Sequence, residues 1–270
     1  MTGSKKKVLL ICLFIFGVLL LCTGCARRQK ADESLDKILE SKRFVMGFDA
    51  KFPPWGYINE ETGEAEGFDI DLAREVCRRM GVELVPQPIN WRTKEEELSH
   101  SKVDCIWNGM SVDDKRVERM TLTAPYMKND LVFVVRNDSD IRSMEQMKGL
   151  KVGVQGGATS QTELERLEIF GSIIEFVEDD NITIMSKIAT GELDAALTDS
   201  VFAYYYVSNQ KENNFLILPQ KIKEEDLAIG FRRGDYALRD RVQQILDEMR
   251  ADGTMARYST KWFGTDITIK

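Results

Sequence analysis

Strand-like and helix-like segments alternate along most of this chain, and no other feature limits its fold as much. In the first half, apolar runs at 43–48, 82–85 and 103–107 predict strands. Apolar residues recur at helical spacing over 72–80, and a capping-box pattern at 93–96 predicts a second helix. A strand–helix–strand–helix–strand order is typical of a mainly parallel sheet with helices on its faces.

The same pattern restarts in the second half of the chain. Four further apolar runs predict strands, at 131–135, 151–154, 173–177 and 193–197. A second capping-box pattern at 160–163, and a helix capped by Asn181 and ended by Gly191, fall between these runs. We therefore expect an α/β fold with two lobes built on one plan, each a mainly parallel sheet flanked by helices.

The boundaries of the lobes depend on where the last predicted helix packs. Its apolar side chains share one face, at Leu238, Val242, Ile245, Leu246 and Met249. If this face packs on the first lobe, the lobes are 41–131 with 228–270, and 132–227, and the chain crosses between them twice. Two crossings make a hinge. We expect the site in the cleft between the lobes, because ligands of open α/β sheets lie beyond the carboxyl ends of the strands.

The first residues have the pattern of a secretory signal. Lys5-Lys6-Lys7 precedes an uncharged run at 8–22, which is short for a transmembrane helix of about 20 apolar residues. Cys25 follows Thr-Gly and resembles the lipid-bearing cysteine of a lipobox. We expect a signal peptide at 1–24, a lipid on Cys25 and a tether at 25–40, which together place the protein outside the cytoplasm on a bacterial membrane. A plain signal or a membrane anchor is the alternative.

Composition argues against several classes of function. The chain holds 44 acidic against 37 basic residues, a net charge of −7, whereas nucleic-acid-binding proteins usually carry a basic balance. A single histidine argues against a His-ligated metal site and His-based catalysis, and we expect no metal or cofactor. Outside the N-terminal segment only Cys77 and Cys105 remain, and their apolar surroundings favour buried free thiols over a disulfide.

Four segments would face the cleft at the ends of the predicted strands, at 49–52, 108–111, 156–160 and 198–199. Gly156 to Ser160 precedes a helix, whose free backbone N–H groups favour an anion. Arg116 could hold a carboxylate through two parallel hydrogen bonds. Its alternative role is a surface ion pair with Asp113 or Glu118.

Two further kinds of side chain complete the expected site. Asp199 ends an apolar strand, where it would accept hydrogen bonds from an ammonium group or cap the next helix; Asp49 is similar. A carboxylate, an ammonium group and a side chain together describe an α-amino acid. Phe52 and Trp91 are the best candidates for an aromatic wall, although aromatic residues near strand ends more often belong to a core.

Several motifs resemble those of a known family. They stand at 47–55, 67–72, Trp91, 109–116, 124–126, 149–155, 193–199, 252–253 and 261–264. In this order they are similar to the polar amino-acid-binding proteins of ABC importers, the family 3 solute-binding proteins, over nearly all of 43–264. The resemblance implies a two-lobed periplasmic-binding-protein fold, also called a Venus flytrap, that closes on its ligand.

The resemblance also assigns roles to residues. Arg116 would clamp the α-carboxylate, helped by the backbone N–H groups of Ser111 and Thr159. Asp199 would hold the α-ammonium group, assisted by the carbonyl of Asn108 or Gly109. The side-chain pocket would be shaped by Asp49, Phe52 and Trp91, with Ala158 at its rim in place of the family's usual hydroxyl residue.

The implied function is capture of a free, polar L-amino acid and its delivery to an ABC permease and ATPase by a monomeric, lipid-anchored binding protein. One alternative is a surface sensor or adhesin that binds the same ligands without transport. Another is an enzyme, since cyclohexadienyl dehydratase is a catalytic relative of this fold. We do not expect an enzyme, because no lysine or histidine is apparent in the cleft. The residues do not identify the preferred amino acid.

Overall fold

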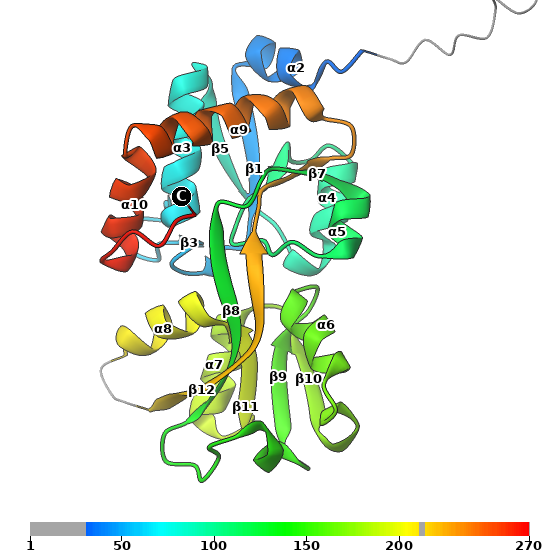
Figure 1. Cartoon of the computed structure of the whole chain (residues 1–270), viewed down its shortest axis with the longest axis vertical. Helices are drawn as coiled ribbons and strands as arrows, with labels where there is room; N and C mark the ends of the chain where they lie inside the picture. Colours follow the sequence, from blue (N-terminus) through cyan, green and yellow to red (C-terminus); the bar gives the residue numbers. More distant parts are fainter. Residues whose placement is uncertain (1–30, 211–213, 270) are drawn as a thin grey trace, which may run out of the picture. The chain divides into compact units, whose positions relative to one another are not determined.

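The computed structural model describes residues 31–210 and 214–269 (Figure 1). The expected signal peptide at 1–24 and Cys25 lie outside these residues. Within them, most strands belong to two five-stranded sheets, and the others form a small three-stranded sheet. No helix in the described ranges combines the length and the apolar character that crossing a membrane requires.

The first sheet has the strand order β5-β1-β6-β13-β7. Its strands are β1 (Arg43–Phe48), β5 (Glu83–Pro88), β6 (Cys105–Ile106), β7 (Met120–Leu122) and β13 (Gly230–Arg232). β1 is parallel to β5 and β6, whereas β13 is antiparallel to β6 and β7. The helices α2 (Ser34–Ser41), α3 (Phe68–Met80), α4 (Lys94–Ser99), α5 (Asp114–Arg119), α9 (Tyr236–Ala251) and α10 (Thr254–Phe263) accompany it.

The second sheet has the order β10-β9-β11-β8-β12. Its strands are β8 (Met127–Arg136), β9 (Lys151–Gln155), β10 (Ile174–Glu178), β11 (Ala195–Asp199) and β12 (Phe215–Leu227). Three helices pack on it, α6 (Thr159–Arg166), α7 (Asn181–Thr190) and α8 (Ser200–Ser208). Short 3-10 turns lie at η1 (Trp91–Thr93), η2 (Met144–Met147) and η3 (Phe170–Ser172). Helices flank both sheets, which confirms the expected architecture. The sheets are not mainly parallel, however, because each has two parallel and two antiparallel pairings.

Two long strands connect the sheets. β8 and β12 run antiparallel over most of their length, and Figure 1 shows them side by side in green and orange. At one end the two strands lie next to segments that accompany the first sheet. Isolated β-bridges there join Leu227 to Ser111 and Met127 to Thr268. At the other end they form one edge of the second sheet. This paired connection is the place where a hinge between the sheets would act.

A small sheet was not expected from the sequence. It contains β2 (Lys51–Phe52), β3 (Gly56–Ile58) and β4 (Ala65–Glu66), all antiparallel. These strands are too short for a periodic apolar signal. The helix α2 was also missed, because its residues were assigned to the tether. Its Ser34 hydroxyl accepts a hydrogen bond from Leu238 N at the start of α9.

Helix positions agree with the sequence, but three of the expected caps are wrong. Asn90 caps the η1 turn that leads into α4, so the Thr93 hydroxyl donates to Asn90 O instead of acting as a cap. α6 begins one residue before Ser160, with Ala158 at the N-cap. α7 is capped by Asp180, whose carboxylate accepts from Thr183 N at 2.7 Å. For α7 the Asp180 carboxylate reaches a free N–H group first, whereas the N-cap residues of α4 and α6 make no side-chain cap bond.

The core confirms two further expectations. The apolar face of α9 is fully buried among the helices beside the first sheet. Cys77 and Cys105 are buried free thiols. The largest buried side chains beside the first sheet are aromatic, among them Trp55, Trp107 and Tyr126.

Candidate functional site

A cavity of ≈ 30 Å³ lies between the two sheets, with room for little more than one or two water molecules. Eight of the ten expected site residues line it: Phe52, Trp91, Gly109, Ser111, Arg116, Ala158, Thr159 and Asp199. Asp49 and Asn108 lie behind this lining and bond to each other, Asp49 N donating to Asn108 Oδ1 at 2.7 Å. Six lining residues were not among those ten: Leu131, Gln155, Ser160, Asn181, Thr198 and Glu225. Of these, Ser160 and Thr198 belong to segments that were expected to face the cleft.

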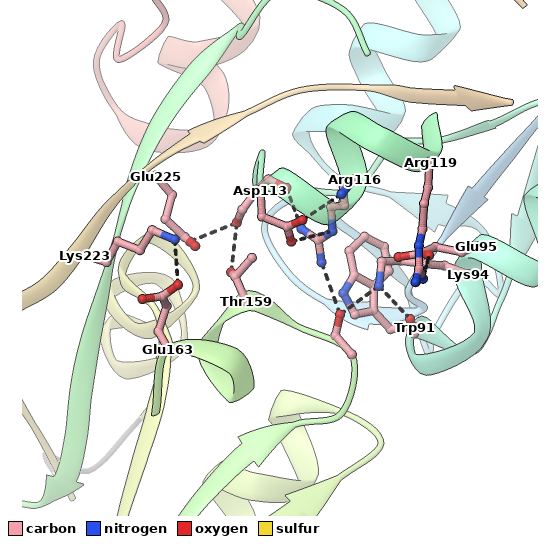
Figure 2. A network of polar contacts seen from close by, with 12 residues as sticks. Trp91, Lys94, Glu95, Asp113, Arg116, Arg119, Thr159, Glu163, Lys223 and Glu225 are labelled. Atoms are coloured by element: carbon pink, nitrogen blue, oxygen red, sulfur yellow. Dashed lines mark hydrogen bonds and ion pairs between the residues drawn. The ribbon is translucent and has the colours of Figure 1, made fainter. Parts of the chain in front are cut away.

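Arg116 is the only arginine that lines this cavity, and it is 3% exposed. It stands on the short helix α5, whose N-cap Asp113 accepts from Arg116 N and lies 3.4 Å from its guanidinium. The guanidinium donates to Ser111 O at 2.5 Å and, across to the second sheet, to Gly157 O at 3.2 Å (Figure 2). Burial lowers the pKa of Arg116. The ion pair with Asp113 is real, but the solvated surface position is wrong.

Of the two roles that the sequence left open for Asp199, the structure shows the helix cap, and the residue also lines the cavity. It ends β11 and caps α8, accepting from Phe202 N at 2.9 Å. It also accepts from the indole N–H of Trp55, on the first-sheet side, at 3.4 Å. Burial, followed by the nearby charge of Glu225, raises the pKa of Asp199 to about 7. A buried carboxylate of this kind is stabilised by any cation that reaches it.

A chain of side-chain hydrogen bonds crosses from one sheet to the other at the expected side-chain pocket. Gln155 Nε2 donates to Asp49 Oδ2 at 2.6 Å, and Asn181 Nδ2 donates to Gln155 Oε1 at 2.8 Å. The Thr198 hydroxyl then donates to Asn181 Oδ1 at 2.9 Å. Burial raises the pKa of Asp49. The chain fixes the orientation of both amides, so this end of the cavity is largely satisfied by its own groups.

Glu225 is the charged lining residue that sequence reasoning missed. It is 3% exposed and lies on β12, in the charged run 223–226 that suggests a solvated strand. Its Oε2 accepts from the Ser111 hydroxyl at 2.9 Å, and the Thr159 hydroxyl bonds that same hydroxyl at 3.2 Å. The sequence did contain a signal for its burial. Alternate residues of a strand share a face, so Glu225 lies on the same face as the apolar Leu227, which is buried.

The turn at Gly109 is held from the first-sheet side. Gly109 has a φ of 57°, and its N–H donates to Asp69 Oδ2 at 2.6 Å. Asp69 also accepts from the Tyr126 hydroxyl at 2.9 Å. Burial raises the pKa of Asp69 to about 7. The turn packs against Trp55. Trp55 and Trp107 are buried core residues, whereas Phe52 and Trp91 line the cavity.

A buried lysine that the sequence did not indicate lies beside the cavity lining, where it contacts Trp91. Lys94 is 2% exposed, and its ammonium group donates to Gly157 O at 2.8 Å and to Trp91 O at 3.1 Å. It lies 5.0 Å from the centre of the Trp91 ring. Burial, aided by the charge of Arg116, lowers the pKa of Lys94 to about 7. Lys94 is not among the residues that line the cavity.

Several hydrogen bonds therefore join the two sheets around one small cavity, and oppositely charged groups line it. The family of bacterial extracellular solute-binding proteins, family 3, matches residues 44–265. The chain belongs to this family. The L-cystine-binding protein TcyJ of Escherichia coli strain K12 is 28% identical to it over 252 residues, which cover 92% of this chain and 93% of that protein.

Solved structures agree with this assignment. An ABC uptake transporter substrate-binding protein from Streptococcus pneumoniae with bound histidine is 31% identical and superposes with a TM-score of 0.85, covering 90% of this chain and all of that one. The ancestral amino-acid-binding protein AncCDT-1, a precursor of cyclohexadienyl dehydratase, is 28% identical with a TM-score of 0.79, covering 85% and 99%. The expected family and its two-lobed fold are confirmed.

Proposed function

We propose that this protein captures a free, polar L-amino acid outside the cytoplasmic membrane and delivers it to an ABC permease and ATPase. The observation that carries the proposal is the pair Arg116 and Asp199. These side chains have opposite charges, come from the two different sheets and line one cavity. The names of the relatives, which are binding proteins for cystine and histidine, support the ligand class.

In this proposal the two poles of the amino acid take the two buried charges. Arg116 holds the α-carboxylate, with the N–H groups of Ser111 and Thr159 as further donors. Thr159 is the first residue of α6, where backbone N–H groups are free to bind an anion. Asp199 holds the α-ammonium group, with the Asn108 or Gly109 carbonyl as a second acceptor. Asp49, Phe52, Trp91 and Ala158 shape the surroundings of the side chain.

Closure of the two lobes is the proposed means of capture. The present arrangement leaves a cavity smaller than an amino acid, enclosed by bonds between the sheets such as Trp55 to Asp199 and Gln155 to Asp49. For a ligand to reach Arg116, these bonds must open, with β8 and β12 as the hinge. A ligand that bonds both sides then favours the closed state, which a permease can recognise.

The proposal also covers the boundaries of the lobes and the N-terminal segment. The lobes are 41–131 with 228–270, and 132–227. Residues 1–24 are a signal peptide, Cys25 carries a lipid, and 25–40 tether a monomer to the membrane. Cys25→Ala is expected to move the protein from the membrane fraction to the soluble extracytoplasmic fraction. Retention in the membrane fraction would contradict the lipid anchor.

Binding without catalysis is part of the same proposal. Asp49 and Asp199 are engaged by Gln155, Trp55 and backbone N–H groups. The lining acid Glu225 accepts from the Ser111 hydroxyl, and the Lys94 ammonium group bonds two carbonyls. None of these side chains is a free general acid or base over a substrate. Incubation with prephenate or arogenate is expected to give no turnover. Turnover would favour the dehydratase alternative.

A thermal-shift screen tests the function directly. Each of the twenty L-amino acids, cystine and ornithine is added to the purified protein, with the D-enantiomers as controls. A ligand present at 100 times its dissociation constant stabilises the native state by about 2.7 kcal/mol. We expect a small group of L-amino acids to raise the melting temperature and their D-enantiomers to have little effect. If none raises it, the proposed function is wrong.

A further inference from the structure

Three buried side chains form a chain of hydrogen bonds at one end of the cavity (Figure 2). The Thr159 hydroxyl donates to the Ser111 hydroxyl oxygen at 3.2 Å, and the Ser111 hydroxyl donates to Glu225 Oε2 at 2.9 Å. All three residues line the cavity, and each is at most 6% exposed. Thr159 stands on α6, beside the second sheet, whereas Glu225 stands on β12, one of the two connecting strands. The chain therefore crosses from one side of the cavity to the other.

Glu225 sets the direction of this chain. A carboxylate accepts hydrogen bonds and has no proton to donate, so the only hydroxyl proton of Ser111 is used in the bond to Glu225. The Ser111 oxygen is then left as an acceptor. The Thr159 hydroxyl provides the matching donor from the opposite side. Without an acceptor behind it, the Ser111 hydroxyl could turn and would no longer present its oxygen to Thr159.

The two bonds of the chain respond differently to the movement of the lobes. Ser111 is held beside β12 by the main chain, through the isolated β-bridge to Leu227. The bond from Ser111 to Glu225 would therefore remain if the lobes moved apart. Thr159 begins α6, which packs on the second sheet, so its bond to Ser111 would be lost. The first bond is preformed, and the second is made by closure.

Glu225 is also bonded to the other connecting strand. Asn129 on β8 donates to the same Oε2 at 3.4 Å, and Asn129 Oδ1 accepts from the Ser200 hydroxyl at 3.0 Å. Asn129 and Ser200 are both buried. An acceptor that is fixed before closure does not have to be ordered when the lobes close, which favours the bond that closure adds.

The charge of Glu225 offers little direct attraction to the proposed ligand. A zwitterionic amino acid has no net charge, so a nearby carboxylate attracts its ammonium pole and repels its carboxylate pole, and the two effects oppose each other. The donors that Glu225 Oε2 does accept from, Ser111 and Asn129, are groups of the protein. Its contribution is therefore expected to pass through Ser111.

We propose that Glu225 is a positioning residue for capture, which fixes the Ser111 hydroxyl as an acceptor so that the Thr159 hydroxyl bonds it when the lobes close. This inference rests on the proposed function and adds a residue that acts on closure and not on the ligand. Breaking the chain should weaken the binding of every accepted amino acid by the same factor. It should do so by faster release, because the bond from Thr159 holds the closed state.

A double-mutant cycle tests whether Glu225 acts through Ser111. Glu225→Met removes the acceptor, and Ser111→Ala removes the hydroxyl but keeps the backbone N–H group. We expect each variant to lower the affinity for the preferred amino acid about tenfold, with faster release in stopped-flow measurements. In the Ser111→Ala background, Glu225→Met should cost less than about twofold more. Losses that multiply to about 100-fold, or tighter binding by Glu225→Met, would overturn the proposal.

Two further variants separate the acceptor from the charge. Glu225→Gln keeps an oxygen that can accept from Ser111, so we expect a loss of only about threefold, which again disappears in the Ser111→Ala background. A loss as large as that of Glu225→Met would contradict the positioning role. Glu224→Met is the matched control, because Glu224 is exposed and pairs with Lys128. It should leave the affinity unchanged, and a loss equal to that of Glu225→Met would also contradict the role.

Melting temperatures show which variants fold. If Glu225→Met does not fold, the cycle with Glu225→Gln decides by the same rule. If the unaltered protein binds an amino acid but the losses in the cycle are independent, only the positioning role is wrong. If the unaltered protein binds no amino acid, the proposed function and the positioning role are both wrong.

Discussion

A glycine turn follows a strand of each sheet near the cavity, which Gly109 lines, and the two turns are held in different ways. Gly109 and Gly157 follow strands of the two sheets, and both have a left-handed φ, 57° and 76°. The Gly109 turn is fixed by its own side of the molecule, through Asp69 and the Trp55 ring. The Gly157 carbonyl is instead gripped from the opposite side, by Lys94 at 2.8 Å and Arg116 at 3.2 Å.

This difference indicates that the Gly109 turn is a preformed part of the site, here called the platform, whereas the Gly157 turn makes its contacts only on closure. All groups that hold Gly109 would stay in place if the two lobes moved apart. The partners of Gly157 would be lost, because they belong to the first-sheet side. We therefore infer that the first lobe presents a finished half-site to a ligand, and that the second half-site is completed only when the lobes close.

The largest expected effect comes from Arg116, which bonds carbonyls on both sides of the cavity. Arg116→Ala removes the donor to Ser111 O and Gly157 O and leaves the ligand's carboxylate unpaired. Charge-assisted hydrogen bonds contribute roughly 1.5–3 kcal/mol each, so affinity should fall by about 100-fold or more. Calorimetry checks the affinity. Near-normal binding by a folded variant would contradict the assignment of the carboxylate to Arg116.

Gly109→Ala should damage the platform itself. The left-handed conformation costs an L-residue about 1–2 kcal/mol, and the new Cβ would lie 3.0 Å from the buried Trp55 ring. We expect the melting temperature to fall with and without ligand. Gly81→Ala is the control, since Gly81 has a φ of 69° and open space around it. An equal fall in both variants would show that the packing of Trp55 against this turn does not matter.

Gly157→Ala should act mainly on closure. Its Cβ would lie 2.9 Å from Arg92 Cα, a backbone atom on the opposite side. We expect a loss of affinity of about tenfold, equivalent to about 1.4 kcal/mol, beyond the small loss of stability from the left-handed φ. Gly149→Ala, at a φ of 78° with open space around it, should lose stability alone. Full affinity in Gly157→Ala would show that this turn is not a closure contact.

The smallest expected effect is a pH dependence of binding. The pKa of Asp199 is raised to about 7, so this carboxyl group takes up a proton as the pH falls below 7. An ammonium group favours the ionised form, so the ligand's affinity should fall below pH 7, by up to about tenfold per unit, with release of a proton on binding. Calorimetry in buffers of different ionisation heat measures this proton. No proton release at pH 6 would contradict the contact with Asp199.

The same raised pKa has the opposite effect on the protein without ligand. A carboxyl group whose folded pKa lies above its unfolded value of 3.8 stabilises the fold most below that value. This contribution is lost as the pH rises toward 7. Asp69 acts in the same direction but does not line the cavity, so only the stability, and not the affinity, should depend on it.

The sequence predicted the local elements better than the contacts between them. Apolar periodicity placed α3, α9 and most strands, because it depends on neighbours within a few residues. The bond from Gly109 N to Asp69 joins residues 40 positions apart, and that from Ser111 to Glu225 joins residues 114 apart. Spacing along the chain does not show which of these groups meet.

The expected ligand residues show the same limit. Arg116 and Asp199 were candidates because they stand near predicted strand ends and in motifs that resemble those of a known family, and both line the cavity. Glu225 was missed, since one buried acid in the run Lys223-Glu-Glu-Asp226 resembles three solvated neighbours. Lys94 was missed for a similar reason, because it lies in a polar helix, and its burial involves contacts with Trp91 and with the Gly157 turn of the opposite side.

Amide hydrogen exchange on the unaltered protein, with and without a saturating amino acid, tests the platform-and-closure account most directly. Exchange reports how often each backbone N–H opens to solvent. The account predicts that amides 107–110 are equally protected in both conditions, and that amides 156–160 become protected only when the ligand is bound. Ligand-induced protection of both segments to the same degree, or of neither, would contradict it.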